Sequence, residues 1–488
     1  MKDKVISMKK NRATIAIIGG GVAGSTAARY LGEFGLDVTL FEKEKSLISG
    51  PPFCHLHAGG NLYREISDAQ CVKLLKQSID FLRFYPYVVD YRPTVIALPV
   101  TDKSIPDALL PRLKLLTSEY EALIQADAGN KVLGESSDYY ALYSREQMEK
   151  LKEQAVVPQP INADEWMIPV AKNIDFDKVQ FPLIMVQEYG LNLFRLASSV
   201  TLRLETMKNV DLKRETVVSN VQENYTGGWD VTYVTEDRAY TAHFDYLVNA
   251  AGFRSGKIDD LIGVDCKRMV EFKAAYISRW ESCCDTLWPE VIFHGERGTP
   301  RGMGQFTPYP DGYFQLHGMT KEITLYEDGL VANSLVSCQP HLPQNFIEKI
   351  ERSWSKEETM QRTQSAIRHL SQFIPSFSEA KVGSKPLFGA QQIPGDDPTL
   401  RVAEVSFPIE NYARCEIVKV SSVLDMIDAI AKKLIGLGYL DEKVYKSRPD
   451  HSSSVLKEEE IATYAAEIAE AREYPASLSK RTVPNRKS

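Results

Sequence analysis

The stretch that decides the fold is residues 14–42, which read TIAIIGGGVAGSTAARYLGEFGLDVTLFE. A β-branched run at its start predicts a buried strand, and glycines follow that strand at once. A helix-forming segment over 25–34 comes next, and then a second strand over 37–41 that ends at the acid Glu42. Strand, glycine turn, helix, strand and acid is the order of a parallel unit that binds a dinucleotide.

The glycines of this turn each have a physical task. Gly19 allows the tight turn, Gly21 lets the backbone approach a pyrophosphate, and Gly24 lets the helix pack close to the strand. The free N–H groups at the helix N-terminus attract phosphates, and Glu42 accepts hydrogen bonds from ribose hydroxyls. An acid at this position disfavours a 2′-phosphate, so NADP is not expected. The predicted contacts are Gly19, Gly20, Gly21, Val22, Ala23, Gly24, Glu42 and Lys43.

A later segment indicates whether the dinucleotide is FAD or NAD. Three strands are predicted over 217–221, 231–234 and 240–244, with a Gly-Gly turn between the first two. The strand that follows ends in Asn-Ala-Ala-Gly at 249–252. Together with the first motif, this order resembles the FAD domain of glutathione-reductase-type flavoproteins, in which small residues let the backbone pass close to the cofactor. The resemblance implies FAD as the cofactor and adds three contacts, which are Val218, Ala251 and Gly252.

Two motifs that the sequence lacks narrow the chemistry. No second GxGxxG follows a predicted strand, since residues 295–304 contain a proline and two arginines and are expected to form a loop. A separate nicotinamide site is therefore not expected, and electrons would enter the flavin from the substrate. The Gly-Asp-Ala-x-His stretch of aromatic hydroxylases is replaced by PGDDP at 394–398, which argues against a monooxygenase.

The order of elements late in the chain points to a narrower family. A helix is followed by a short strand, by a second strand over 387–394 and then by Asp397. This order resembles D-amino-acid-oxidase-type flavoproteins, which include sarcosine, glycerol-3-phosphate and 2-hydroxy-acid dehydrogenases or oxidases. The strand-to-helix step over 416–424 is similar to the last flavin-contacting segment of sarcosine oxidases, although residues 414–416 stand where that family often has glycines.

Lys419 is the residue that this resemblance singles out. It would lie near flavin N1 and C2=O, where a fixed cation stabilises the reduced flavin and favours hydride uptake at N5. The alternative is a solvated lysine at the start of a helix.

The loop after the second strand is unusual, because residues 50–61 read GPPFCHLHAGGN. By the resemblance, this loop runs beneath the flavin, and glycerol-3-phosphate dehydrogenases have a similar His-Gly-Gly there. His57, Gly59 and Gly60 are therefore carried over as flavin-site residues. His57 would hydrogen-bond the flavin or accept a proton, or it would cap a turn as a structural histidine. Covalent attachment of FAD is a further alternative, at Cys54, His55 or His57.

The expected fold class is α/β, with a Rossmann-type FAD-binding domain interleaved with a mixed, mostly antiparallel-sheet substrate domain. The expected boundaries are 13–85, 183–265 and 385–440 for the FAD-binding domain, 86–182 and 266–384 for the substrate domain, and 441–488 for a C-terminal helical extension and tail.

Substrate contacts are expected on a hairpin of the second domain, whose turn is Asp-Gly at 311–312. In the strand that follows, Tyr313, Gln315 and His317 share one face because side chains alternate. By the resemblance this sheet roofs the substrate pocket, so the three residues contact substrate, or else they form an exposed polar strand face. Two loop arginines are candidates for bidentate binding of a substrate carboxylate, Arg297 and Arg301. The candidate catalytic residues are His57, His317 and Lys419.

Composition and charge exclude other classes. The 488 residues are 43% hydrophobic and 25% charged, which predicts a globular chain, and the net charge of −7 argues against a nucleic-acid partner. The sequence has neither an apolar run of about 18 residues nor the apolar stretch of a signal peptide, so no transmembrane segment is expected. Seven cysteines without a CxxC pair fit a cytoplasmic, reducing compartment, and no metal site is expected.

The C-terminal region predicts one more helix. Ile461, Tyr464, Ala465 and Ile468 form an apolar stripe, which would pack on the body of the protein or on a second subunit of a homo-oligomer. The basic end that starts at Lys480 is expected to be a frayed tail.

These observations predict an FAD-dependent oxidoreductase that transfers a hydride from a small amine, amino acid or 2-hydroxy acid to flavin N5. The substrate class follows from the resemblance, and dioxygen, a quinone or another acceptor would reoxidise the flavin. One alternative is a 2-hydroxy-acid:quinone dehydrogenase at the membrane surface. The other is a non-catalytic flavin-binding sensor.

Overall fold

The structure is a computed structural model, and it describes residues 12–50, 56, 66–400, 403–446 and 456–483. Its two main sheets have six and nine strands. A separate three-stranded meander packs against the six-stranded sheet. The residues predicted for the loop after the second strand lie outside the described residues, and they are Cys54, His55, His57, Gly59 and Gly60.

Six strands form the first sheet. In spatial order they are β19 (Val405–Ser406), β20 (Tyr412–Cys415), β12 (Tyr246–Asn249), β1 (Thr14–Ile18), β2 (Asp37–Phe41) and β8 (Val210–Lys213). All neighbours are parallel except β19 and β20, and β1 lies between β12 and β2. The strand–helix–strand unit predicted from the sequence is confirmed as the centre of a parallel sheet.

Alternation along β1 divides its side chains between two layers. Ile15 and Ile17 pack among the helices, whereas Ala16 and Ile18 pack with the meander. The meander consists of β9 (Val217–Glu223), β10 (Trp229–Thr235) and β11 (Arg238–Phe244). It follows the order predicted for an FAD domain, and Trp229 of β10 joins the same apolar cluster as Ala16.

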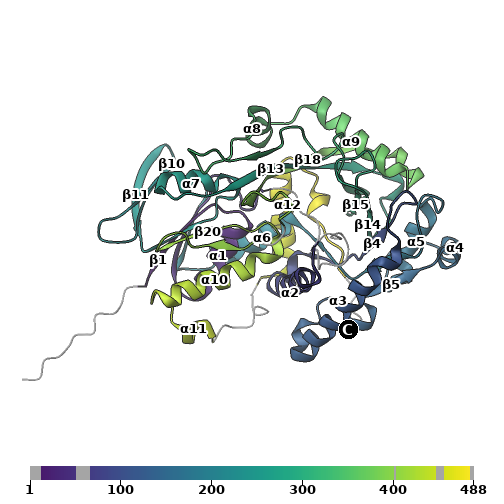
Figure 1. Cartoon of the computed structure of the whole chain (residues 1–488), viewed down its shortest axis with the longest axis horizontal. Coiled ribbons are helices and arrows are strands. Elements are labelled where there is room, and N and C mark those ends of the chain that lie inside the picture. Colours follow the sequence, from purple (N-terminus) through teal and green to yellow (C-terminus); the bar gives the residue numbers. More distant parts are fainter. Residues whose placement is uncertain (1–11, 51–55, 57–65, 401–402, 447–455, 484–488) are drawn as a thin grey trace, which may run out of the picture.

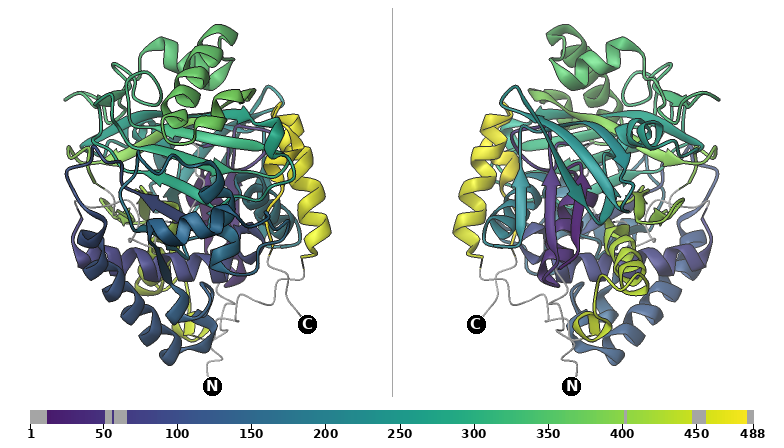
Figure 2. Two further views of the ribbon diagram at one scale, coloured as in Figure 1. Left: turned by 90° about the vertical axis from the view of Figure 1, so that its right-hand side faces the viewer. Right: turned by 90° about the vertical axis from the view of Figure 1, so that its left-hand side faces the viewer.

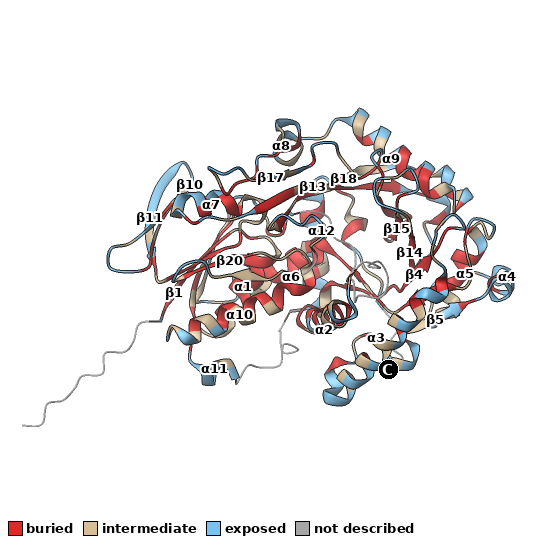
Figure 3. Cartoon of the chain, viewed as in Figure 1, coloured by how far each residue is buried: buried red, intermediate tan, exposed pale blue. Residues whose placement is uncertain are grey.

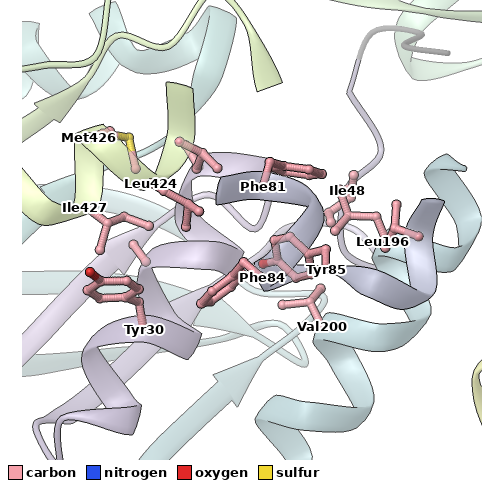
Figure 4. Close-up of a cluster of buried hydrophobic side chains, with 14 of the residues drawn as sticks. Tyr30, Ile48, Phe81, Phe84, Tyr85, Leu196, Val200, Leu424, Met426 and Ile427 are labelled. Atoms are coloured by element: carbon pink, nitrogen blue, oxygen red, sulfur yellow. The ribbon is translucent and has the colours of Figure 1, made fainter. Parts of the chain in front are cut away.

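Helices cover the other face of this sheet. They are α1 (Val22–Glu33), α2 (Asp68–Phe84), α6 (Leu193–Glu205) and α10 (Val423–Gly436). Figure 4 shows Tyr30 of α1, Phe84 of α2 and Ile427 of α10 gathered in one apolar cluster. The ring centroids of Tyr30 and Phe84 lie 6.1 Å apart. Because α1 is held from several sides, its N-terminus stays beside the glycine turn.

The second sheet is almost entirely antiparallel. In spatial order its strands are β17 (Leu330–Ala332), β13 (Arg268–Arg279), β16 (Tyr313–Gly318), β15 (Gly304–Pro308), β14 (Glu290–Phe293), β4 (Thr94–Ala97), β6 (Leu183–Val186) and β5 (Tyr140–Tyr143), and β18 (Lys381–Pro394) also pairs with β13. Only β14 and β4 run parallel. The mixed, mostly antiparallel sheet predicted from the sequence is confirmed. The division into domains stays a prediction, and β6 and β18, near its boundaries, are both paired within this sheet.

Aromatic side chains form part of the core between this sheet and helix α9 (Lys356–Ser371). The rings of Phe306 and Phe314 stack with centroids 4.3 Å apart, and Phe377 meets Phe306 edge to face. Helix α9 packs over β13 and β18, and Figure 3 shows its inner side buried and its outer side exposed. The remaining elements are α3 (Leu110–Ala126), α4 (Arg145–Lys152), α5 (Ala163–Asn173), α7 (Ser255–Ile262), α8 (Gln344–Glu351), α11 (Glu442–Lys446), β3 (Val89–Asp90) and β7 (Gly190–Leu191). Figure 1 shows α9 above the nine-stranded sheet, with α3, α4 and α5 at one end of the molecule.

The C-terminal helix α12 (Glu458–Ala471) packs against α6, and Figure 2 shows it in yellow along one side of the molecule. Ile461, Ala465 and Ile468 are buried, so the predicted apolar stripe is used within this chain. The expectation of a frayed end is wrong for residues 480–482. Arg481 donates hydrogen bonds to the carbonyl oxygens of Pro86 (2.7 Å) and Val89 (3.0 Å), and these bonds hold the end of the chain against the body of the protein.

Candidate active site

The glycine turn after β1 is packed so tightly that two of its glycines have no room for a side chain. Gly19 has a φ of +103°, and a Cβ there would lie 2.4 Å from the carbonyl oxygen of Ala250. A Cβ on Gly24 would lie 1.9 Å from the carbonyl oxygen of Gly19. Both distances are far inside van der Waals contact, so a side chain at either position would push α1 away from β1 and β12.

Gly21 differs from its neighbours because a Cβ there would meet no atom within 4 Å. Its backbone is extended, and α1 begins with the next residue. Among the described residues, no side chain caps the N-terminus of α1, and its first turn carries no acid. The N–H groups of this turn are therefore left to a ligand, and the helix dipole favours an anionic one.

Glu42 lies at the end of β2 with only 7% of its surface exposed. Its Oε2 accepts a hydrogen bond from the Gly20 N–H (2.6 Å), and its Oε1 accepts one from the Glu44 N–H (2.7 Å). Burial raises the pKa of Glu42, and the two backbone hydrogen bonds oppose part of that shift. Each oxygen keeps a second lone pair, so the carboxylate can still accept a ligand hydroxyl.

A cavity of about 1220 Å³ begins at this turn. Its wall combines residues of β1, β2 and β9 with residues of β13, β16 and β18, so it extends between the two sheets. This size exceeds that of a pocket for one small ligand and suits an elongated dinucleotide together with a substrate. The predicted cofactor contacts that line it are Gly19, Gly21, Val22, Ala23, Glu42, Lys43, Val218, Ala251, Gly252 and Lys419.

Two predicted contacts shape the turn without lining the cavity. Gly24 packs against Gly19, and the Gly20 N–H orients Glu42. A Cβ on Gly20 would lie 2.6 Å from the side chain of Leu47, so this glycine also permits the next loop to come close.

The hairpin that was expected to contact substrate contributes two of its three candidates to the wall. Gln315 and His317 of β16 line the cavity. The hydroxyl of Tyr309 lies 3.2 Å from Oε1 of Gln315, which helps to orient that amide. Tyr313 is not part of the wall, and its ring instead lies 5.4 Å from the guanidinium carbon of Arg279.

Of the two candidate arginines, Arg297 lines the cavity and Arg301 does not. Arg297 forms an ion pair with Glu271, with Nη2 and Oε1 2.7 Å apart. Lys273 forms a second ion pair with the same carboxylate, with Nζ and Oε2 2.5 Å apart. Burial raises the pKa of Glu271, but the two cations outweigh it and lower that pKa, so the group is an anion at neutral pH.

Reasoning from the sequence missed Glu271 and Lys273, although a signal was present. They stand two residues apart in the middle of β13, where the residues from 269 to 277 are otherwise apolar, so they lie on the same face of the strand. Two charges on one face of a buried strand indicate a polar surface inside the protein. Arg297 comes from the loop after β14, and only the pairing of the strands brings it to them.

Lys419 lies half-buried on the cavity wall, just before α10. The strand-to-helix step predicted over 416–424 starts after the strand has ended. Strand β20 ends at Cys415, and residues 416–419 connect it to the short 3₁₀ turn Val420–Ser422 that precedes α10. The side-chain amide of Gln391 on β18 donates a hydrogen bond to the Val418 carbonyl oxygen (2.9 Å). This bond ties the connection to the second sheet at the rim of the cavity.

Two features are absent from the described part of the chain. None of its helices is long and apolar enough to cross a membrane. No group of three or more His, Cys, Asp and Glu side chains in it could hold a metal ion.

Comparison with solved structures shows the same fold in two dehydrogenases and a deaminase. L-proline dehydrogenase from P. horikoshii has a TM-score of 0.54 at 15% identity, over 89% of this chain and 96% of that one. Glycerol-3-phosphate dehydrogenase from Bacillus halodurans, in complex with FAD, has a TM-score of 0.55 at 12% identity, over 96% and 74% of the two chains. L-amino acid deaminase from Proteus vulgaris has a TM-score of 0.54 at 14% identity, over 89% and 96%. Among curated proteins, no match was found.

The residues present fit FAD. Gly19 and Gly24 leave no room for side chains, the first turn of α1 offers uncapped N–H groups, and the cavity continues from there to the second sheet. A family model described as FAD dependent oxidoreductase (DAO) matches residues 14–390, well over half of the sequence. The chain therefore belongs to the DAO family of FAD-dependent oxidoreductases, and FAD is its cofactor.

Proposed function

We propose that the protein oxidises a small amine, amino acid or 2-hydroxy acid with FAD bound along this cavity. The observation that carries the proposal is the continuity of the cavity, which joins the glycine turn to a charged wall formed by Glu271 and Lys273 of β13 and by Arg297. A cofactor whose diphosphate lies at the turn has room to extend toward that wall, and a small substrate can share the same cavity.

The chain's own groups would hold FAD as follows. The diphosphate would lie against Gly21 and the first turn of α1, a ribose would donate to Glu42, and the adenine end would lie beside Val218. When bound, FAD supplies an acceptor for the substrate hydride at N5. Lys419 would keep a positive charge beside the ring, which favours electron uptake.

The charged wall would orient the substrate. Lys273 and Arg297 can bind a carboxylate, while Glu271 can accept hydrogen bonds from an ammonium or a hydroxyl group. His317 on the same wall is a candidate to accept the substrate proton, because imidazole titrates near neutral pH. Proteins of similar fold are named for proline, amino acids and glycerol 3-phosphate, which supports a small polar substrate.

The test is an anaerobic substrate screen on the purified yellow protein. A panel of amino acids, secondary amines and 2-hydroxy acids is added without dioxygen, and bleaching of the flavin absorbance is followed. Dioxygen and a soluble quinone are then compared as reoxidants. Acid precipitation of the same sample shows whether the flavin stays with the polypeptide.

The matched variant is Glu271→Gln, which keeps the shape of the side chain and removes its charge. Bleaching by one substrate class in the wild type, with a raised KM for it in the variant, is the expected result. If no compound of the panel bleaches the bound flavin, the proposal is wrong, and a non-catalytic flavin-binding role becomes the better account.

A further inference from the structure

One arginine of the C-terminal segment reaches the wall of the dinucleotide cavity. Arg472 follows directly after α12, and its guanidinium bonds to the loop after β2. Nε and Nη2 donate to Ser46 Oγ (3.0 and 2.7 Å), Nη2 also donates to the Leu47 carbonyl oxygen (2.6 Å), and Nη1 donates to the Ile48 carbonyl oxygen (2.9 Å). One side chain therefore satisfies three acceptors in three consecutive residues.

The loop that Arg472 holds is strained at a residue that faces the cavity. Ile48 has a φ of +58°, a left-handed conformation that a β-branched side chain rarely adopts. Its side chain is 1% exposed and lines the cavity, together with Ser49 and Gly50. Such a conformation persists only where its surroundings impose it.

Both backbone groups of Ile48 are held from outside the loop. Its N–H donates to the Gly20 carbonyl oxygen (3.0 Å), and its carbonyl oxygen accepts from Arg472. Gly20 in turn donates to Glu42. A chain of hydrogen bonds thus leads from the C-terminal segment, through the strained residue, to the turn at which the diphosphate would lie.

We propose that Arg472 is a positioning residue for the cofactor: it holds the 46–50 loop in the conformation that forms one wall of the FAD cavity. The proposal rests on FAD binding along this cavity and is independent of the substrate. Arg472 lies beyond residues 14–390, which the family model covers.

The experiment compares Arg472→Ala and Arg472→Lys with the wild type. Lysine keeps the charge but lacks the planar fork, so it cannot serve Ser46, Leu47 and Ile48 together. We expect FAD affinity to fall about tenfold or more in both variants, because bonds from a charged donor to partly buried acceptors are lost. Affinity is measured by fluorescence titration of flavin-depleted protein. The visible circular dichroism of the bound flavin is a second readout, and it applies equally if the flavin is covalently attached.

Ser46→Ala is the milder variant, in case Arg472→Ala does not fold. It removes two of the four bonds and should weaken FAD binding in the same direction by a smaller factor.

The matched control is Arg481→Ala. Arg481 also anchors the C-terminal segment, through Pro86, Val89 and Glu458, and its hydrogen bonds to these three described residues do not involve residues 46–50. It should lower the thermal midpoint of unfolding while leaving FAD affinity and the dichroism spectrum within about twofold of wild type. The proposal is overturned if folded Arg472 variants keep wild-type affinity and spectrum, or if Arg481→Ala weakens FAD binding as strongly as Arg472→Ala. A protein that binds FAD normally yet oxidises nothing would refute the proposed function alone.

Discussion

Substituting Gly24 by alanine should damage the fold itself, whereas the same change at Gly21 should damage only cofactor binding. The new Cβ at position 24 would lie 1.9 Å from the Gly19 carbonyl oxygen and 3.0 Å from Cβ of Ala250. The backbone of Gly19 cannot move away from this Cβ, because its N–H donates a hydrogen bond to the Phe41 carbonyl oxygen (2.8 Å) and because it already packs closely against the backbone of Ala250. Helix α1 must therefore move away from the sheet.

The magnitude follows from two opposing effects. Overpacking of this kind costs about 1–3 kcal/mol, and an overlap with rigid backbone belongs at the upper end of that range. Alanine in a helix interior is favoured over glycine by about 1 kcal/mol, which offsets part of the cost. The net destabilisation expected for Gly24→Ala is about 2 kcal/mol. It should lower the thermal midpoint of the flavin-depleted protein by several degrees and weaken FAD binding as well.

Gly21→Ala is the matched control, because φ is −65° there and a Cβ would meet no atom within 4 Å. The methyl group projects into open space at the position expected for the diphosphate. Stability of the flavin-depleted protein should stay within about 0.5 kcal/mol of wild type, while FAD affinity falls. Differential scanning fluorimetry with and without FAD measures both effects. Equal loss of stability in the two variants, or wild-type FAD binding by Gly24→Ala, would refute this account of the turn.

Three further changes test the site. Lys419→Met should slow anaerobic reduction of the flavin by substrate about tenfold or more if the lysine charge acts on the ring, and an unchanged stopped-flow rate would rule that role out. FAD affinity should fall on acidification as Glu42 is protonated. Because burial raises the pKa of Glu42, this fall should occur at a higher pH than for an exposed glutamate. Titrations of FAD binding from pH 7 to 5 should show this dependence in the wild type and not in Glu42→Gln. Since the folded pKa lies above the unfolded one, Glu42 also costs the fold stability at neutral pH, and that cost should diminish as the pH falls through the raised pKa. Glu271→Gln should leave Lys273 and Arg297 without their anion, so inhibition by simple carboxylates should strengthen, and unchanged inhibition constants would contradict the charged wall.

Much of the cavity near the glycine turn, where FAD would bind, was predictable because its residues are consecutive in the sequence. A β-branched run, three glycines at short spacing, a helix and a second strand each follow from local preferences, and together they leave one arrangement. The same holds for the meander, whose turn at 227–228 and alternating strands lie within thirty residues. The substrate end was predicted less completely. Gln315 and His317 could be placed on one face by alternation, but the position of that face relative to a cavity could not be.

By itself, the sequence determined the parallel unit, its glycine turn and the class of cofactor, because each depends on contacts between neighbours in the chain. Only the tertiary structure decided which distant groups meet. Glu271 and Arg297 come together through strand pairing, and Arg472 meets Ser46 although 426 residues separate them. The physical reason is that an ion pair or hydrogen bond between distant residues depends on the packing of whole sheets and helices, and no local pattern encodes that geometry.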